Sequence, residues 1–408
     1  MDISAKLLEW LSLSGLGFAE ACAENVQNAG LMDDSGGAGV VGATFAVFSS
    51  LYAFMQAPKF AASRSFHKEL KLRTNAYFTE AGKDTTGDSR LFAKAVILTV
   101  SFVALYLHLV FLTPPTWLAL VECALLGLVG SAIGFNVMHD GAHGSFSKSK
   151  WVNQFASFTL NVLGGNSFMW NMKHNLIHHM YTNVDGVDDD LDAQPWLRLS
   201  STQTRYGFHR FQHLYFWFFY ALLFIAWIFF MDYQKYFKGK IGEMPIKKMT
   251  ASDQGVFWGF KALHLFLFVA LPIYTVGFVA WILGFLVFAT VVGFTMSIVF
   301  QLAHTVEHAA FPMPHEITNK LEDEWAIHQI KTTANFATDS KVISWLVGGL
   351  NFQVEHHLFP NISHIHYPAL NKIIRQACEE FGVEYNEYPK MRYAVASHVA
   401  HLREMGRA

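Results

Sequence analysis

TPPTWLALVECALLGLVGSAIGFNVMHDGAH, residues 113–143, begins with an uncharged turn and ends on two histidines. Between them, 117–138 carries a single charge and is long enough for a helix to cross a membrane. A second apolar segment, 95–113, leads into the turn, so the two segments predict a helical hairpin that returns to its starting side. His139 and His143 follow at the exit, four residues apart, and share one face of a helix.

The composition also indicates a membrane protein. Of 408 residues, 52% are hydrophobic and 15% are charged, whereas a soluble protein carries about 25% charged residues. The formal net charge of −2 gives no sign of a nucleic-acid partner. Three widely separated cysteines predict neither a disulfide framework nor a CxxC site. The N-terminal residues lack a basic segment followed by an apolar core, so we expect no cleavable signal peptide.

Three further apolar segments follow the first hairpin. Segments 256–276 and 278–302 predict a second transmembrane hairpin. Segment 211–231 has arginines before it and lysines after it, and because basic flanks mark the cytoplasmic side we expect it to be interfacial or re-entrant. The uncharged segment 40–57 is a candidate extra span. The expected fold class is an all-α integral membrane protein with two transmembrane hairpins, four spans, and a helical cytoplasmic cap that holds the histidines.

Histidines recur in tight groups on the expected cytoplasmic face. The motif HNLIHH places His174 and His178 on one helical face, and His179 beside them can reach a second metal ion. One zinc ion takes about four ligands, so eight histidines suit two five- or six-coordinate ions. The predicted ligands, including one glutamine three residues before a histidine pair, are His139, His143, His174, His178, His179, His304, His356, His357 and Gln353.

The residue types leave the metal open, because imidazole suits iron, copper, zinc and nickel alike. The membrane setting favours chemistry on a lipid. An unactivated C–H bond of an acyl chain needs a strong oxidant, which two iron ions with O2 can supply. Nearby carboxylates would offset the metal charge and orient imidazole N–H groups; we expect this role for Asp140, Asp188, Asp190 and Glu355. The acidic run 185–192 lacks EF-hand spacing, which argues against calcium.

The motifs HDGAH, HNLIHH and QVEHH together resemble the three histidine boxes of the membrane fatty acid desaturase family, over about residues 60–390. Gln353, in place of the first histidine of the third box, is similar to the front-end and linoleoyl-CoA-type branch. The resemblance implies a di-iron centre on the cytoplasmic side that uses O2 and two electrons to introduce a cis double bond. It also implies a ligand at the end of the last span, which His304 matches. From the resemblance we expect Gln353 to bind metal or to hold a water that does.

The resemblance also implies the domains and partners. We expect a desaturase domain at 59–390, an N-terminal extension at 1–58 and a C-terminal tail at 391–408. Residues 1–58 hold no histidine and no HPGG haem motif, so electrons are expected from a separate ferredoxin or cytochrome b5. The resemblance implies a fatty acyl-CoA or acyl-lipid substrate, and a bacterial inner membrane or the endoplasmic reticulum is the expected location. An apolar tunnel for its acyl chain is expected to be lined by Trp170, Phe168, Trp345 and Phe352.

Two alternatives stay open at this point. The same metal site could hydroxylate a lipid or an alkane, because the motifs do not show which hydrogens are abstracted. A non-catalytic metal- or lipid-binding membrane protein is the alternative from another class. A metal transporter should place its ligands near mid-membrane, whereas these histidines lie at the ends of the predicted spans.

Overall fold

The computed structural model describes residues 57–62, 65–242 and 244–408, and they are mostly helical. The expected extra span at 40–57 and the extension at 1–58 lie outside the described residues except at their last positions. The fold class expected from the sequence is confirmed: 68% of the structure is helical, with two minimal two-stranded sheets. Five described helices are long and apolar enough to cross a membrane.

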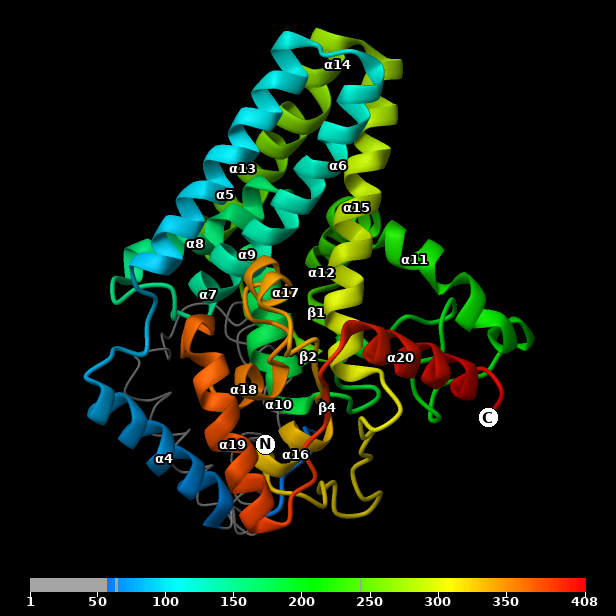
Figure 1. Ribbon diagram of the computed structural model, residues 1–408. Helices are drawn as coiled ribbons and strands as arrows, with labels where there is room; N and C mark the ends of the chain where they lie inside the picture. Colours follow the sequence, from blue (N-terminus) through cyan, green and yellow to red (C-terminus); the bar gives the residue numbers. More distant parts are fainter. Residues whose placement is uncertain (1–56, 63–64, 243) are drawn as a thin grey trace, which may run out of the picture. The chain divides into compact units, whose positions relative to one another are not determined.

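Two helical hairpins form the bundle (Figure 1). In the first, α5 (Ser89–Leu107) and η1 (His108–Leu112) turn at Thr113 and return as α6 (Thr116–Ile133) and η2 (Gly134–Met138). In the second, α13 (Ala251–Leu265), η7 (Phe266–Ala270) and α14 (Leu271–Val276) turn into α15 (Phe278–His304). That turn is at Gly277, whose φ of 82° favours glycine. Both turns lie at the same end of the bundle, at the top of Figure 1.

Helices α6 and α15 pack closely at the centre of the bundle. Gly127 makes this approach possible, because a Cβ there would lie 2.9 Å from the carbonyl oxygen of Phe288. Polar side chains cap the first helix of each hairpin: Asp88 accepts from the backbone of Arg90 at the start of α5, and Thr250 forms a capping box at the start of α13. The sequence therefore specifies where the first helix of each hairpin begins and how tightly the hairpins meet.

The segment Gly207–Lys238 lies outside the two hairpins and is also long and apolar enough to cross a membrane. It comprises η5 (Gly207–Phe211), α11 (Gln212–Ala226), η6 (Trp227–Met231) and α12 (Asp232–Lys238). Figure 1 shows α11 running obliquely to the bundle beside α20 (Met391–Met405). Length and composition do not separate a spanning from an interfacial helix, so the interfacial location stays a prediction.

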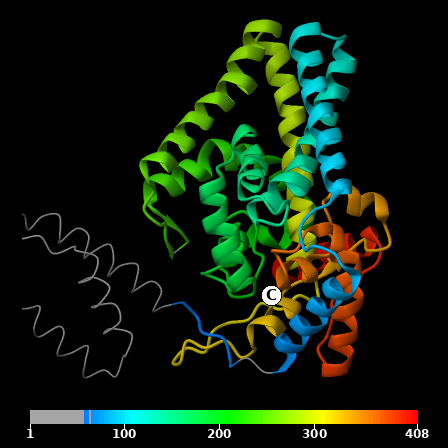
Figure 2. The same cartoon turned by 90° about the vertical axis from the view of Figure 1, so that its left-hand side faces the viewer.

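The remaining segments form a cap at the end remote from the two turns. Figure 2 shows α4 and α19 at this end of the molecule. Their apolar faces meet in a buried core that includes Phe66, Leu70, Leu370 and Ile374. The cap elements are α4 (Ser65–Ala81), α7 (His139–Ala142), α8 (Lys150–Val162), α9 (Ser167–Trp170), η3 (Asn171–His178), α10 (His179–Tyr181), η4 (Asp189–Leu191), β1 (Lys240–Ile241), β2 (Met244–Pro245), α16 (Trp325–Lys331), β3 (Asn335–Phe336), α17 (Lys341–Leu346), α18 (Gln353–Leu358), η8 (His364–His366), α19 (Tyr367–Phe381) and β4 (Glu387–Tyr388).

Residues 391–408, expected as a tail, contain the helix α20 packed on α11 and α15. The side chain of Gln212 donates to the backbone oxygen of Leu402 at 2.8 Å, and the buried guanidinium of Arg198 donates to the backbone oxygens of Met405 and Ala408. The chain end is therefore part of the packed structure rather than a separate appendage.

Candidate metal centre

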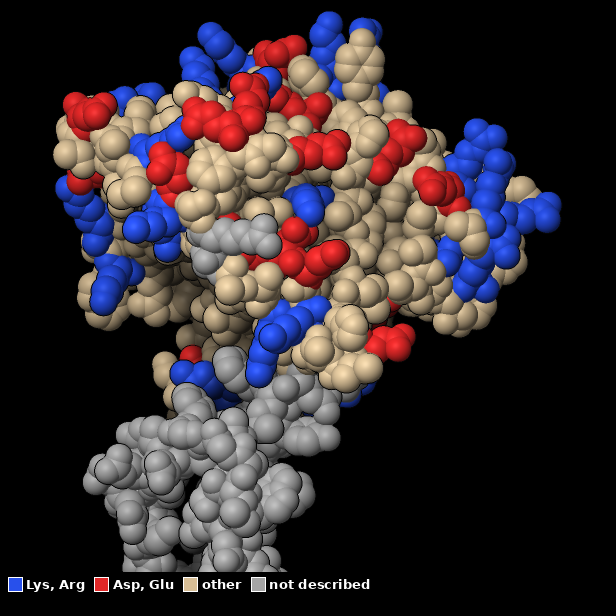
Figure 3. Space-filling view, turned by 90° about the horizontal axis from the view of Figure 1, so that it is seen from below, with Lys and Arg blue, Asp and Glu red and all other residues tan. Residues whose placement is uncertain are grey.

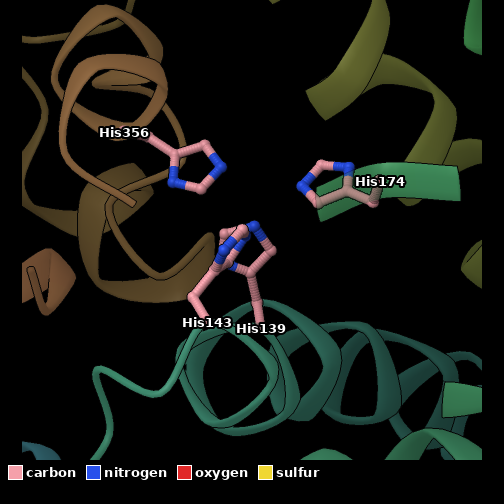
Figure 4. A group of neighbouring side chains, drawn as sticks. All are labelled: His139, His143, His174 and His356. Carbon is pink, nitrogen blue, oxygen red and sulfur yellow. The ribbon is translucent and has the colours of Figure 1, made fainter. Parts of the chain in front are cut away.

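Four imidazoles from three separate segments point toward one another (Figure 4). His139 and His143 come from the end of the first hairpin, His174 from η3 and His356 from α18. All four are buried, and one nitrogen of each lies within 4.8 Å of the corresponding nitrogen of the others. The rings of His139 and His356 are 4.4 Å apart between centroids. The spacing HxxxH at the helical exit thus supplies two donors to a single centre.

A second group lies beside the first. His178, His304 and His357 place nitrogens within 4.8 Å of one another, and all three side chains are buried. His304 is the last residue of α15, so the end of the second hairpin delivers it to the centre. Its ring centroid lies 4.8 Å from those of His178 and His357. Both transmembrane hairpins therefore contribute a histidine directly at their exits.

His179 joins the two groups. Its ring centroid lies 4.5 Å from that of His356 and 4.5 Å from that of His357. Its Nε2 is 3.2 Å from the Nε2 of His174. Two imidazole nitrogens at this distance require a proton on one of them or a cation that both lone pairs face. The structure thus brings all eight predicted histidines together.

His174 and His178 lie one in each histidine group but remain close neighbours, as the sequence predicts. His174 and His178 stack with centroids 5.2 Å apart, as their shared face predicts. With Asp190 they also form a further candidate group, and His179, expected to reach a second metal ion, lies between the two histidine groups. Residues 171–178 form a π-helix, whose wider turn shifts side chains relative to an α-helix.

Two ligand candidates have their rings fixed by side-chain oxygens. His178 Nδ1 lies 3.0 Å from Asp188 Oδ2, and His357 Nδ1 lies 2.9 Å from Gln329 Oε1. The Gln329 oxygen also accepts from the Thr182 hydroxyl at 3.0 Å. Because neither a carboxylate nor an amide oxygen can donate, each ring carries its proton on Nδ1 and directs the Nε2 lone pair inward.

Two more rings have oxygen partners. His304 Nδ1 lies 3.3 Å from the backbone oxygen of Thr332, and His356 Nδ1 lies 3.1 Å from the Tyr367 hydroxyl. The carbonyl at Thr332 can only accept, which fixes the Nδ1–H tautomer of His304. This pattern of a ring bound at one nitrogen and open at the other is typical of metal-ligating histidines.

The inward nitrogens provide the test of whether a metal fits. Among the eight histidines of the centre, five buried ring nitrogens have no hydrogen-bond partner in the described part of the chain: Nε2 of His139, His143, His356 and His357, and Nδ1 of His179. Leaving a buried polar group without a partner costs about 1–3 kcal/mol. A cation at the meeting point of these lone pairs would satisfy several of them at once, so the donor set fits a pair of metal ions.

For His178, the carboxylates of Asp188 and Asp190 outweigh the effect of burial and raise the pKa. Five other histidines of the centre are held in the neutral form that binds metal. Burial is the main cause of their lowered pKa values. The neighbouring histidines lower the pKa further, because each added positive charge would repel the next. The pKa is lowered well below 6.5 for His143, His174, His179, His356 and His357.

The predicted carboxylates have different partners. Asp188 contacts His178 as described above. Asp190 lies 3.6 Å from His178 but 2.6 Å from the ammonium of Lys173, which is the main group holding its pKa low against the effect of burial. Asp140 accepts from the Ser363 hydroxyl at 2.7 Å and lies 3.0 Å from His364 Nδ1, so its carboxylate is directed toward η8.

Glu355 also has its partners away from the imidazoles. Its carboxylate accepts from the Tyr385 hydroxyl at 2.6 Å and from the Asn335 side-chain amide at 2.7 Å. Complete burial raises its pKa to about 7. The residue thus ties α18 to the cap. The expectation that Asp140 and Glu355 orient ligand rings is not met by any hydrogen bond of the described residues, because adjacent helix positions point about 100° apart.

The predicted substrate residues are dispersed. Trp170 stacks on His174 with centroids 4.4 Å apart and lines a cavity beside the centre. Phe352 is packed in the core of the cap, and the Trp345 ring lies 5.1 Å from the ammonium of Lys94. Phe168 is half-buried in α9. Gln353 is buried at the start of α18, before the histidine pair.

Sequence reasoning missed the oxygens that fix the rings, chiefly Gln329, Thr332 and Tyr367. Gln329 and Thr332 lie in or next to the short helix α16, and a single buried amide or hydroxyl leaves no periodic signal. Tyr367 directly follows the histidine-rich run, which is the one hint available. His308 is exposed and lies outside both histidine groups.

The fold and the centre define a multi-pass helical membrane protein with a candidate dinuclear site built from histidines. The model of the family described as fatty acid desaturase matches residues 115–389. The chain belongs to the fatty acid desaturase family; it is an oxidoreductase that acts on fatty acyl chains, as the sequence predicts.

Relatives support the same conclusion. The chain is 36% identical to the sn-1 linoleoyl-lipid 6-desaturases of Arthrospira platensis and of Synechocystis sp., over 85% and 86% of this chain and 94% and 98% of theirs. It is 33% identical to the acyl-lipid (8-3)-desaturase of Physcomitrium patens, over 85% of this chain and 72% of that protein. Membership of the family implies the use of iron and O2.

Proposed function

We propose that the protein introduces a cis double bond into the acyl chain of a membrane lipid, at two iron ions held by the two histidine groups. The single observation that carries the proposal is the set of buried, neutral and unpartnered imidazole nitrogens that face one another. The names of the relatives favour an acyl-lipid over an acyl-CoA substrate. Overall, the acyl chain loses two hydrogens while O2, two electrons and two protons become two waters.

The histidines divide between the two ions. His139, His143, His174 and His356 would hold one iron, His178, His304 and His357 the other, and His179 lies where it can serve either. Gln353, at the start of the helix that carries the histidine pair, is a further ligand or the holder of a water. Iron bound there supplies, with O2, the oxidising power that an unactivated C–H bond requires.

The protein's own part is orientation and exclusion of water. Asp188, Gln329 and the Thr332 carbonyl accept Nδ1 protons and fix the rings. Trp170 covers His174 from the side of the adjoining cavity, so an acyl chain there would meet an apolar wall next to the metals. Burial of the whole group keeps bulk water from the reacting carbons.

We propose that the centre faces the cytoplasm. Charged side chains of both signs are spread over the cap when it is viewed from its own end (Figure 3), as a water-facing surface requires. The basic flanks of 211–231 favour the cytoplasmic side in either a bacterial inner membrane or the endoplasmic reticulum. We take 59–390 as the desaturase domain, with 1–58 before it; residues 391–408 follow it and contain α20, which packs on α11 and α15 of the domain.

The electrons come from a separate carrier in this proposal, a ferredoxin or a cytochrome b5. Residues 1–58 contain no histidine that could ligate a haem. Hydroxylation by the same centre is the second candidate function, because the arrangement of histidines alone would support it. Mass spectrometry separates the two, since desaturation removes two hydrogens and hydroxylation adds one oxygen.

The test is expression in a host that lacks the product, with fatty-acid profiling and iron analysis of the purified protein. We expect new unsaturated chains in the membrane lipids and about two irons per chain. His357→Ala should abolish both the product and part of the iron, while His308→Ala, at an exposed histidine outside the groups, should leave both unchanged. Labelled acyl-CoA and labelled phospholipid, supplied separately to membranes, distinguish the two substrate sources. Iron-free but active protein would contradict the proposal.

A further inference from the structure

Two cavities lie side by side in the described part of the bundle. The first, of about 80 Å³, reaches the metal centre at His174 and Trp170. Polar side chains also line it, among them Lys173, Asp190 and Lys235. The cavity therefore combines a polar boundary with an apolar wall next to the proposed irons, which suits the part of a lipid where the acyl chain meets its head group.

The second cavity, of about 30 Å³, is almost wholly apolar. One wall is the helical face that carries Gly130, Gly134 and Met138, spaced four residues apart and leading to His139. This apolar cavity suits the methyl end of an acyl chain, because that end carries no polar group. Trp227 and Met296 line both cavities and so form the partition between them.

The partition is fixed by a buried ion pair. The indole N–H of Trp227 donates to Asp232 Oδ1 at 3.0 Å, and the other carboxylate oxygen accepts from the ammonium of Lys261 at 2.7 Å. That ammonium also donates to the backbone oxygens of Gly164 and Ile228, at 2.6 and 3.2 Å. A buried pair with its hydrogen bonds complete has little freedom to move. Asp232 thereby positions the indole.

Gly134 leaves the second cavity open. Gly134 lies in a helical segment between Gly130 and Met138, which line the same cavity. A Cβ at position 134 would nevertheless meet no described atom within 4 Å. A larger side chain at 134 thus has room to occupy the cavity without displacing the backbone. The space beside residue 134 in the second cavity is empty because glycine has no side chain.

We propose that Trp227 and Gly134 determine which acyl chains the enzyme accepts. The inference rests on the proposed function: the head-group end of the lipid lies in the first cavity, the reacting carbons lie beside His174, and the methyl end passes Trp227 into the second cavity. Trp227 sets the width of that passage, and Gly134 sets how much tail fits beyond it. Asp232 is a positioning residue that acts through the indole. One methylene in an apolar pocket changes selectivity about 10- to 200-fold.

The experiment is a competition between two acyl chains that differ by two methylenes at the methyl end, fed as a mixture to cells that express the full-length protein. The ratio of longer to shorter desaturated product is measured. Trp227→Leu should raise this ratio about tenfold or more, and Gly134→Val should lower it by a similar factor. Asp232→Asn should shift it in the same direction as Trp227→Leu, which a merely structural role would not do.

Gly259→Val is the matched control, because Gly259 is an exposed helical glycine with no described atom within 4 Å of a Cβ, and it lines neither cavity. It should leave the ratio unchanged. If the wild type is active and the ratios of Trp227→Leu and Gly134→Val stay within about twofold of it, the inference is wrong. If Trp227→Leu does not accumulate, Gly134→Val alone decides in the same way. A wild type without desaturated product would instead refute the proposed function.

Discussion

Gln329 offers the sharpest test of how the centre is held, because it contacts a metal-ligand candidate without being one. Its Oε1 accepts from His357 Nδ1 at 2.9 Å and from the Thr182 hydroxyl at 3.0 Å, and the side chain is fully buried. Gln329→Leu keeps the approximate volume and removes the acceptor. The ring of His357 then loses the contact that fixes its proton on Nδ1.

The magnitude follows from these contacts. Removing the partner of a metal-bound histidine lowers metal affinity about 10- to 100-fold, which corresponds to about 1.4–2.8 kcal/mol. The Nδ1–H of His357 left without this acceptor costs about 1–3 kcal/mol in folding stability, whereas the Thr182 hydroxyl keeps its hydrogen bond of 2.7 Å to the backbone oxygen of His178. The loss should therefore appear in the iron affinity and in the thermal unfolding midpoint together.

The assay is competition for iron against a chelator of known affinity in purified, detergent-solubilised protein. Gln376→Leu on the exposed face of α19 is the matched control, and it should bind iron like the wild type. An iron affinity of Gln329→Leu within about twofold of the wild type would refute the claim that Gln329 holds His357.

Three further outcomes are expected. Gly348→Ala should destabilise the protein by about 2–5 kcal/mol. The backbone of Gly348 has a φ of 59°, and a Cβ there would lie 2.3 Å from the backbone oxygen of Phe135. Equal unfolding midpoints of the variant and the wild type would contradict this. Removing iron should lower the unfolding midpoint, because the metal binds the folded state and satisfies the buried nitrogens; a midpoint indifferent to chelation would count against the site. Iron-free protein should lose stability as pH falls below about 6.5. The reason is that histidines of the unfolded chain then take up protons, whereas the folded histidines with lowered pKa do not. Equal stability in urea unfolding at pH values above and below 6.5 would refute this.

Hydropathy and spacing predicted the parts of the fold that depend on local sequence. The hairpin around Thr113 and the hairpin around Gly277 follow from apolar length and a turn between uncharged ends. His139 and His304 could be placed at helix exits for the same reason. These features need no knowledge of which segments meet in space.

The contacts between distant segments could not be predicted in this way. Gln329 reaches His357, and Tyr367 reaches His356, through packing of the cap that no periodic pattern encodes. His174 and His178 each join a different histidine group and also share a group with Asp190; this placement depends on a π-helix, which the sequence does not mark. Glu355, beside the histidine pair, has its partners in the cap because its helix position points there.

The divided geometry of the centre is the central claim, and anomalous diffraction at the iron absorption edge tests it most directly. Crystals of the iron-loaded protein should show two anomalous peaks. One should lie among His139, His143, His174 and His356, and the other among His178, His304 and His357. A single peak, or peaks outside these two groups, would contradict the account.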